Sequence, residues 1–307
     1  MPRFFLSALM VLALLGGAGG CGKEEGKPIA LEGSETVKDT PRQEARVRFA
    51  VGGMITPKEG MAYYRDLLHF IQDKIGVKVV YVDREGYAEI NEMLKDGNLE
   101  VAFVCSGPYI DGKKEFGLEL LVAPQAYGAT VYYSYIIVAK DSPITSFNEL
   151  RGKRFAFTDP LSNTGKLVPT YMLAKQKETP ETFFKETIFT KSHDKSIKAV
   201  AQGIVDGAAV DSLIWEYLKA TNPEFTSQTR ILQKSPPYAI PPVVVPVNLD
   251  PGLKNRLKQA FLNAHLDPQG REILKKTRID KFVVIDDKAY DSVREMKEWL
   301  ATQKARK

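Results

Sequence analysis

A short segment rich in hydrogen-bonding side chains, Asp159 to Gly165, holds the residues of this chain best suited to binding a small ligand. It reads DPLSNTG, and Pro169 and a helical run follow it. Hydroxyls, an amide and free backbone N–H groups therefore gather at the start of a helix, where the helix dipole is positive. Such an arrangement predicts a binding site for an anion.

Ordinary helix capping is the alternative, because Ser, Asn, Thr and Asp are also preferred N-cap residues. A cap needs one such residue, whereas Ser162 to Gly165 places four polar or permissive residues in a row. Lys166 adds a cation to the first turn, where it opposes the helix dipole unless a negative group lies between them. These features favour the anion site. A nucleotide-binding P-loop is excluded, since G-x-x-x-x-G-K-[ST] requires Gly at Pro160 and Ser or Thr at Leu167.

The N-terminus has the pattern of an export signal. Arg3 precedes an apolar run from Phe4 to Leu15, and small residues from Gly16 to Gly20 lead to Cys21. The apolar run is too short to span a bilayer. It resembles a bacterial lipoprotein signal, with cleavage before Cys21 and lipid attached there, although Ala18 stands where such signals most often carry Leu. An ordinary secretory signal with a chance cysteine is the alternative.

Residues 21–45 are expected to form a lipidated, flexible tether once residues 1–20 are removed as a signal peptide. They are rich in Gly, Lys and Glu and have almost no bulky apolar side chains, so they cannot bury enough surface to fold. Lipid on Cys21 would hold the protein to a membrane face. Cys105 would then be the remaining cysteine, which excludes an internal disulfide. Its place after an apolar strand indicates a buried, inert thiol.

The charge distribution gives no sign of a nucleic-acid partner. The chain has 43 Lys and Arg against 38 Asp and Glu, a formal net charge of +5, and the basic residues are dispersed. The motifs H-E-x-x-H and G-x-S-x-G and a Cys/His cluster do not occur in the sequence. We therefore expect no metal, no cofactor and no catalytic residues, and an enzyme is the less favoured alternative.

Strand and helix patterns alternate along the chain after the tether, which is typical of α/β proteins with parallel sheets. The expected strands are Arg46 to Val51, Val77 to Val82, Val101 to Val104, Arg154 to Phe157, a strand near Ile188, and Ala208 to Val210. The expected helices are Lys58 to Ile75, Tyr87 to Asp96, a helix after Gly165, His193 to Gln202, Ser212 to Ala220, Pro251 to Ala264, Asp267 to Lys276 and Tyr290 to Gln303.

Two long runs of β-branched and aromatic residues, Thr130 to Ala139 and Pro242 to Val247, are predicted to be crossings between two lobes. Lobe 1 would comprise residues 46–131 and 248–307, and lobe 2 residues 132–247, including the hinge strands. A ligand would lie in the crevice outside the carboxyl ends of the strands.

From about Arg46 to Leu300 the chain resembles the PhnD-type phosphonate and phosphite binding proteins of bacterial ABC importers, which have the type II periplasmic binding protein fold. The resemblance rests on YIIVAKDSPITSFNELRGKRFAFTDP, on S-x-T-G-x-x-x-P in place of the more usual S-T-S-G-x-x-x-P, and on SHDKSIKAVAQGIVDGAAV. It implies two α/β lobes, each a mainly parallel sheet flanked by helices, joined by two crossing strands.

The resemblance also implies which residues of lobe 2 bind the ligand. Ser162, Asn163, Thr164 and the N–H groups around Gly165 would hold the oxygens of a tetrahedral phosphorus oxyanion. His193, at the start of the next helix, would add a donor. Judged without the resemblance, a lone histidine at a helix start is more often a capping or surface residue.

Lobe 1 and the first crossing strand would contribute two tyrosines and a helix start. Tyr87 and Tyr132 match tyrosines that line the cleft in relatives, and Ser106 with Gly107 presents another helix N-terminus. Aromatic residues are also common packing material, so both tyrosines could instead belong to the core.

Relatives that take 2-aminoethylphosphonate place a carboxylate where this chain has Leu213, and Asp211 lies two residues earlier. The resemblance thus favours an amine-free ligand, namely phosphite, phosphate or a simple alkylphosphonate, with Asp211 accepting from a protonated oxyanion. In the alternative, Asp211 binds an amine.

The N-terminal pattern predicts an exported, lipid-anchored protein, and the resemblance implies that it delivers its ligand to an ABC permease; we expect a monomer. A ligand-sensing partner of a membrane signalling protein would have the same pocket and is the second alternative.

Overall fold

The computed structural model describes residues 46–52, 57–84 and 86–305, which belong to one compact unit, Gln43–Lys307. The predicted signal peptide, Cys21 and the tether lie outside the described residues. Among the helices described, none is both long and apolar enough to cross a membrane.

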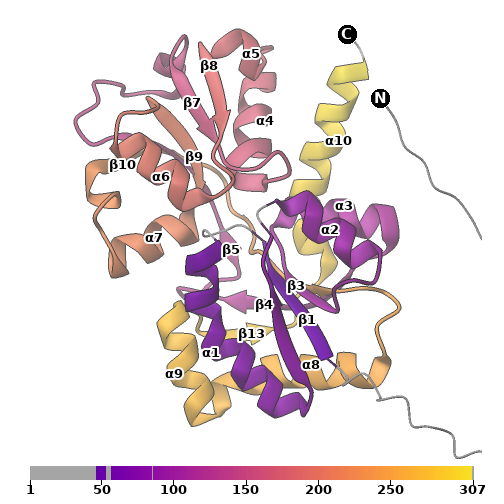
Figure 1. The fold of residues 1–307 in the computed structure, drawn as a ribbon. Coiled ribbons are helices and arrows are strands. Elements are labelled where there is room, and N and C mark those ends of the chain that lie inside the picture. The colour runs from indigo at the N-terminus through magenta and orange to yellow at the C-terminus, as the bar shows by residue number, and fades with distance from the viewer. Residues whose placement is uncertain (1–45, 53–56, 85, 306–307) are drawn as a thin grey trace, which may run out of the picture. The chain divides into compact units, whose positions relative to one another are not determined.

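The unit contains two main sheets (Figure 1), and the larger one forms the core of what we call lobe 1. Its strands are β1 (Arg46–Val51), β2 (Lys78–Val82), β3 (Val101–Phe103), β4 (Glu119–Gln125), β12 (Val243–Val245) and β13 (Lys281–Val283). Their order is β13-β4-β12-β3-β1-β2; β2, β1 and β3 are parallel, and the remaining pairs are antiparallel.

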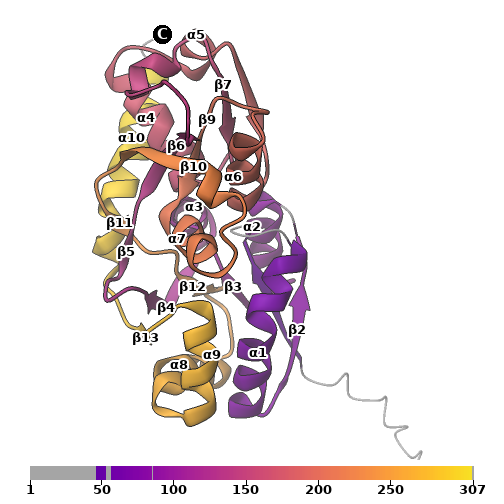
Figure 2. The same ribbon diagram turned by 90° about the vertical axis from the view of Figure 1, so that its left-hand side faces the viewer.

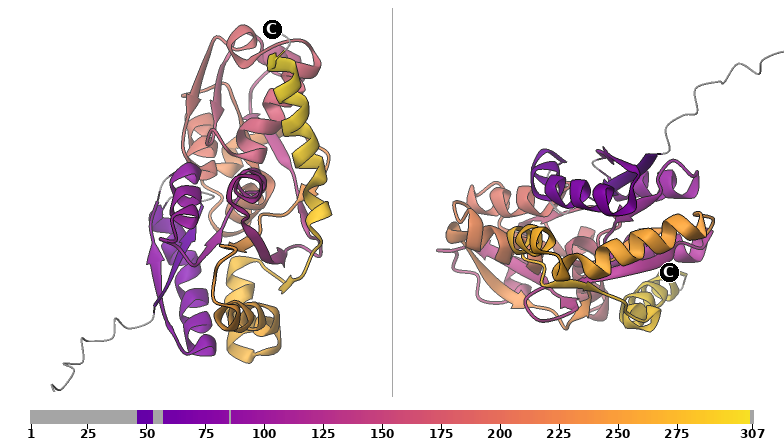
Figure 3. Two further views of the ribbon diagram at one scale, coloured as in Figure 1. Left: turned by 90° about the vertical axis from the view of Figure 1, so that its right-hand side faces the viewer. Right: turned by 90° about the horizontal axis from the view of Figure 1, so that it is seen from below.

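Helices cover both faces of the lobe 1 sheet because alternate side chains of β1 are buried on opposite faces. Val47, Phe49 and Val51 pack with side chains of α1 (Pro57–Ile75), α8 (Pro251–Asn263) and α9 (Pro268–Thr277). Ala50 belongs to the opposite cluster, with side chains of α2 (Tyr87–Lys95), α3 (Ser106–Phe116) and α10 (Asp291–Ala305). The two helix groups are seen apart in Figure 3.

The five-stranded sheet forms the core of lobe 2. Its strands are β6 (Ser134–Ala139), β7 (Arg154–Phe157), β8 (Glu186–Phe189), β9 (Gly207–Asp211) and β10 (Thr229–Lys234), in the order β10-β6-β9-β7-β8. Strands β8, β7 and β9 are parallel, and β6 and β10 add antiparallel pairs. Its helices are α4 (Val168–Lys175), α5 (Pro180–Phe183), α6 (His193–Ala201) and α7 (Ser212–Thr221).

Short helical segments complete the chain. They are η1 (Phe147–Leu150), the π-helical turn η2 (Asn163–Leu167), η3 (Thr226–Gln228), η4 (Ala264–Leu266) and η5 (Asp287–Tyr290). Of these, η2 runs directly into α4 and carries the predicted anion-binding residues.

The chain passes between the two sheets through β5 (Val131–Tyr132) and β11 (Tyr238–Ala239), which pair antiparallel. The first crossing lies within the expected run, Thr130 to Ala139, but the second lies before the expected Pro242 to Val247. That run instead supplies β12, between β4 and β3 of the lobe 1 sheet. Its three valines are fully buried, as in a central strand covered on both faces.

The C-terminal helix α10 contacts helices of both lobes, whereas the sequence suggested packing on lobe 1 alone. Lys297 pairs with Asp111 of α3 at 2.7 Å. Trp299 lies edge-on to Tyr171 of α4, with ring centroids 5.1 Å apart. Figures 1 and 2 show α10 running alongside α4.

The two lobes share one local arrangement, which lies at β1 in lobe 1 and at β7 in lobe 2. Arg48 donates its backbone N–H and its guanidinium to Glu100 and a further N–H to the carbonyl of Gly97. Arg154 makes the same contacts with Asp206 and with the carbonyl of Gly203. Both pairs are 52 residues apart in sequence, and each lobe 2 residue follows its lobe 1 equivalent by 106 positions (154 less 48).

Candidate functional site

Within the segment predicted to bind an anion, residues 162–165 form a tight, buried turn. Ser162 caps η2, and its Oγ accepts from the N–H of Gly165 at 3.0 Å. A Cβ at Gly165 would lie 2.4 Å from Thr158 Oγ1, so only glycine fits. The N–H of Gly165 is thus used within the turn, which corrects the expectation that it faces the ligand.

Asn163 and Thr164 are buried and carry polar atoms without a partner. Asn163 Nδ2 donates to Tyr132 Oη at 3.1 Å, while its Oδ1 has no hydrogen-bond partner. A 180° turn of the amide would exchange these roles and present the donor instead. Thr164 Oγ1 is also unpartnered, and Ser134 Oγ fixes this residue by donating to its carbonyl at 2.6 Å.

His193 begins α6 and is fully buried. Its Nδ1 accepts from the backbone N–H of Asp211 at 3.0 Å, so the proton of the neutral ring lies on Nε2. Nε2 has no partner, nor has the Oγ of Ser192 beside it. Burial lowers the pKa of His193 to about 3. At neutral pH the ring is therefore an uncharged N–H donor.

Asp211 ends β9 and caps α7. Its Oδ1 accepts from the N–H of Leu213 at 2.7 Å, and its Oδ2 is buried without a partner. Burial raises the pKa of Asp211 to about 7, although the N–H groups of Leu213 and Ile214 oppose the rise. Near neutral pH this carboxyl can therefore either donate a proton to an oxyanion or accept one from it.

Tyr87 begins α2 in lobe 1 and reaches lobe 2 through its backbone. Its N–H donates to Asp159 Oδ2 at 3.2 Å. Its hydroxyl is buried and has no hydrogen-bond partner. Burial raises the pKa of Tyr87 well above its usual value, the nearby Cys105, Asp159 and Asp211 add to the rise, and the Ser162 side chain opposes it. The phenol is therefore a neutral donor.

Tyr132 and Ser106 lie in the same region but have partners. The Tyr132 hydroxyl accepts from Asn163 and lies 3.6 Å from Cys105 Sγ. Ser106 Oγ donates to the carbonyl of Ala239 in β11 at 2.7 Å. Ser106 thus ties the start of α3 to a crossing strand and commits its hydroxyl proton there.

The two lobes touch at the turn that carries η2. The N–H of Asn163 donates to Cys105 Sγ at 3.4 Å. A Cβ at Gly107 would lie only 2.3 Å from the carbonyl oxygen of Leu161. Glycine at position 107 therefore permits the closest backbone approach between the lobes at this point.

Lys166, which the sequence placed near the anion, lies elsewhere. Its Nζ stands 3.7 Å from the centroid of the Phe157 ring and 5.4 Å from that of Phe189. Among the buried polar and charged residues in the described part of the chain, none is Lys or Arg. The same part contains no group of three or more His, Cys, Asp or Glu arranged to hold a metal ion.

The residues of the candidate site offer several neutral donors and one carboxyl that are buried in the protein. Among the candidate site residues, the buried atoms without a partner are Tyr87 Oη, Asn163 Oδ1, Thr164 Oγ1, Ser192 Oγ, His193 Nε2 and Asp211 Oδ2. Each unpartnered buried polar group costs roughly 1–3 kcal/mol. A small oxyanion that hydrogen-bonds to them would recover that cost, and charge-assisted bonds would strengthen its binding.

Sequence reasoning missed residues that organise the site. Thr158 Oγ1 lies 3.0 Å from His193 Nδ1 and fixes both the ring and the turn at Gly165. Ser192 was also missed as a candidate site residue. Its position directly before His193, as the N-cap of α6, was the signal that could have indicated it. Cys105 is buried as expected but accepts a hydrogen bond at the contact between the lobes.

Comparisons with known proteins identify the family of this chain. Residues 49–290 match the family model described as "ABC transporter, phosphonate, periplasmic substrate-binding protein". The phosphonates-binding periplasmic protein of Escherichia coli is 27% identical over 239 residues, which cover 76% of this chain and 70% of that protein. A phosphate-import protein of Mycolicibacterium smegmatis is 30% identical over 167 residues, covering 50% of this chain and 51% of that protein.

A solved structure of similar fold is the binding protein component of an ABC phosphonate transporter from Pseudomonas aeruginosa. It has a TM-score of 0.78 and 25% sequence identity, and the match covers 83% of this chain and 86% of that chain. The fold is thus the two-lobed type II periplasmic binding protein fold. Because the family model spans most of its length, this chain belongs to the family of phosphonate periplasmic substrate-binding proteins of ABC transporters.

Proposed function

We propose that this substrate-binding protein captures a small phosphorus oxyanion, namely phosphite, phosphate or an alkylphosphonate, between its two lobes. As a member of its family the chain works outside the cytoplasm and serves an ABC importer. The proposed ligand-binding residues are Tyr87, Tyr132, Asn163, Thr164, Ser192, His193 and Asp211, with Ser162, Gly165 and Ser106 shaping the site.

The observation that carries the proposal is the set of buried, unpartnered polar atoms contributed by both lobes. Hydroxyls of Tyr87, Thr164 and Ser192 and the Nε2–H of His193 are donors of the kind that bind phosphoryl oxygens at helix starts. With no buried Lys or Arg among the described residues, binding depends on dipoles and hydrogen bonds. Neutral donors avoid the cost of burying an unpaired cation when the site is empty of ligand.

Asp211 gives the site a way to recognise protonated oxyanions. Its free Oδ2 would accept from a P–OH group when ionised, or donate to an oxygen when protonated. Sulfate carries no proton near neutral pH, so it can use only the protonated form of Asp211. We expect phosphorus oxyanions to be preferred over sulfate.

Capture requires the lobes to separate and close, and the crossing strands β5 and β11 are the proposed hinge. Closure would bring Tyr87 to Asp159 and Gly107 to Leu161, as in the contacts described above. Excluding water in this way strengthens each hydrogen bond to the anion. A ligand that binds both lobes shifts the population toward the closed form.

The remaining parts of the proposal concern the context of the protein. A lipid on Cys21 would anchor a monomer to the membrane through the tether, so that the binding unit can reach its permease. The relatives are transport components, and we propose that this chain likewise has no enzymatic activity.

A thermal-shift and calorimetry screen tests the proposed function. The screen contains phosphite, phosphate, methylphosphonate, 2-aminoethylphosphonate, sulfate and acetate. A ligand at about a hundred times its dissociation constant adds roughly 2.7 kcal/mol of stability, which is readily measured. We expect a response to at least one phosphorus oxyanion and none of similar size to acetate. A protein that responds to no phosphorus oxyanion would overturn the proposal.

A further inference from the structure

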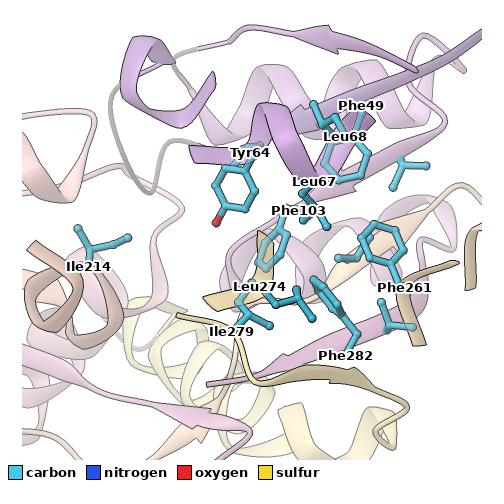
Figure 4. Packing of buried hydrophobic residues seen from close by; sticks show 14 of the residues in the cluster. Phe49, Tyr64, Leu67, Leu68, Phe103, Ile214, Phe261, Leu274, Ile279 and Phe282 are labelled. Carbon is cyan, nitrogen blue, oxygen red and sulfur yellow. The ribbon is translucent and has the colours of Figure 1, made fainter. Parts of the chain in front are cut away.

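A second feature of the region between the lobes is an apolar cavity that the anion-binding residues do not line. Its walls include Tyr64 of α1, Phe103 of β3, Leu213 and Ile214 of α7, Ile240 and Ile279. Figure 4 shows Tyr64, Phe103 and Ile279 on the lobe 1 side and Ile214 on the lobe 2 side. The space open to the centre of a water-sized sphere is about 60 Å³.

The size of the cavity suits a short carbon chain. A single water needs roughly 10–15 Å³ on this scale, so the cavity has room for about four waters or a chain of a few carbon atoms. Walls made of aliphatic and aromatic side chains bind water poorly. An apolar group of this size would therefore gain free energy by displacing whatever water the cavity holds.

The cavity adjoins the anion-binding residues on two sides. Leu213 lines it, and the N–H of the same residue donates to Asp211 Oδ1 at 2.7 Å. On the lobe 1 side, Gly52 donates to the carbonyl of Phe103 at 2.8 Å. A Cβ at Gly52 would lie 3.5 Å from the Tyr87 ring. Asp211 is therefore bonded to one lining residue, and Tyr87 is separated from another by Gly52 alone.

The cavity arises because different residues occupy equivalent positions at two helix starts. Gly107 and Leu213 occupy the same position in α3 and α7, 106 residues apart. Gly107 lets lobe 2 approach until the Leu161 carbonyl is in contact. Leu213 instead presents a side chain that is half-buried and faces the cavity. The lobes are thus in close contact at one helix start and leave a lined space at the other.

The charges around the cavity limit what it can hold. Arg278 is the one charged residue among those that line it, all of which belong to the described ranges, and it is exposed. With a cation present and no carboxylate in the wall, an ammonium group inside the cavity would lose its hydration. Asp211, which lies next to the wall, already uses its Oδ1 to accept from the Leu213 N–H, and its remaining Oδ2 belongs to the proposed oxyanion site. An uncharged alkyl group meets no such penalty.

We propose that the apolar cavity lined by Leu213, Ile214 and Phe103 receives the organic substituent of an alkylphosphonate whose phosphonate group occupies the oxyanion site. The inference rests on the proposed function and narrows it: the preferred ligands are phosphonates with an uncharged chain of about three carbons.

Calorimetric titration with phosphite, methylphosphonate, propylphosphonate and 2-aminoethylphosphonate tests the inference on the full chain. Propylphosphonate and 2-aminoethylphosphonate have the same number of non-hydrogen atoms and differ by a terminal methyl against an ammonium group. Each buried methylene is worth about a fourfold gain in affinity, so propylphosphonate should bind roughly tenfold or more tightly than methylphosphonate. The affinity for propylphosphonate should also exceed that for 2-aminoethylphosphonate by about tenfold or more.

Two substitutions and a control place the effect at the cavity. Leu213→Glu puts a carboxylate in the wall at a helix start, where an acidic residue is tolerated. It should shift the affinity ratio toward 2-aminoethylphosphonate. Leu213→Phe reduces the cavity volume. It should lower the ratio of the affinity for propylphosphonate to that for methylphosphonate toward one. Leu266→Glu, at a leucine that is 63% exposed and outside the cavity, should leave both ratios unchanged.

The outcomes separate the two proposals. If phosphite or methylphosphonate binds but the propyl chain gives no gain, the cavity assignment is wrong and the proposed function stands. The cavity assignment is also wrong if the Leu213 variants leave both ratios at wild-type values while remaining folded by circular dichroism. If none of the four ligands binds but phosphate does, the cavity assignment is wrong and the proposed function stands. If phosphate does not bind either, both proposals fail together.

Discussion

Lobe 1 and lobe 2 repeat one backbone arrangement but bring different side chains to the ligand. The constant offset of 106 residues relates Arg48 to Arg154 in the fold. The same offset relates Tyr87 to His193 at the starts of α2 and α6, and Cys105 to Asp211 before α3 and α7. Both lobes therefore contribute helix starts to the proposed site, where helix dipoles would favour an anion.

The side chains at equivalent positions differ, which suggests different roles for the two lobes in the proposed site. Lobe 1 offers a phenol and a thiol, whose pKa values burial raises, so both are neutral. Lobe 2 offers an imidazole held in one tautomer and a carboxyl with a pKa of about 7. Lobe 2 thus holds the groups that discriminate between protonation states, and lobe 1 adds neutral donors and closes the site.

The largest effect is expected from removing the lobe 2 donor at His193. His193→Ala should weaken oxyanion binding on the order of ten- to hundredfold, the range for leaving a charged hydrogen-bonding partner unsatisfied. Because burial and the Asp211 N–H keep the ring neutral, with a pKa near 3, the ratio of wild-type to variant affinity should be equal at about pH 5.5 and 8. Calorimetry at both pH values measures it.

Tyr87→Phe is the matched change in lobe 1. It removes one hydroxyl and keeps the ring, so a loss of about tenfold is expected. If Tyr87→Phe has no effect while His193→Ala does, lobe 1 contributes no donor. Full-strength binding by both variants would contradict the shared site.

An effect similar in size to that of Tyr87→Phe is expected from disturbing the contact between the lobes. Gly107→Ala places a methyl group against the Leu161 carbonyl, and overpacking of this kind typically costs about 1–3 kcal/mol. Because the cost applies to the closed form, affinity for every oxyanion should fall by about tenfold. Calorimetry with the control Gly252→Ala, on the surface of α8, measures the difference. Unchanged affinity in Gly107→Ala would show that the contact does not limit closure.

Asp211→Asn should change the pH dependence of stability between pH 5 and 8. A substitution at the equivalent lobe 1 residue, Cys105, should not. The pKa of Asp211 in the folded protein lies near 7, above its ordinary value of 3.8. The stability that this proton contributes is complete below about pH 4 and is lost as the pH rises through 7. The variant cannot ionise, so above pH 7 the ligand-free variant should melt at a temperature a few degrees higher than the wild type. Thermal melts between pH 5 and 8 measure the difference in melting temperature. If the melting temperatures of variant and wild type change in parallel with pH, the shifted pKa is contradicted.

The smallest effects are expected at the paired Arg–carboxylate contacts. The Glu100 and Arg48 side chains are 19% and 27% exposed, against 33% and 43% for Asp206 and Arg154. Glu100→Gln should therefore destabilise the protein more than Asp206→Asn, with each loss about 1 kcal/mol or less. Urea denaturation measures both. Equal or reversed losses would contradict the predicted dependence on exposure.

Sequence patterns predicted much of this fold because most elements carry local signals. The strand Arg154–Phe157 and the start of α6 at His193 lie where alternation and capping placed them. Strand β4 lacked such a signal, since Pro124 lies within it and proline is unusual inside strands. The run at Val243–Val245 was placed in a crossing because its burial on both faces depends on β3 and β4, which lie far away in sequence.

The site was less predictable than the fold, for a physical reason. The polarity of residues 162–165 indicated an anion site, but the hydrogen bond that uses the Gly165 N–H depends on the geometry of the π-helical turn. The direction of Lys166 depends on Phe157 and Phe189, which no local pattern relates to it. The tautomer of His193 depends on a backbone N–H that lies 18 residues away.

The most direct test of the account is a crystal structure of the protein with methylphosphonate. The account predicts one phosphonate group between the lobes, with oxygens about 2.6–3.2 Å from Thr164 Oγ1, Tyr87 Oη and His193 Nε2. A phosphonate bound elsewhere, with these three atoms directed away from it, would contradict the account.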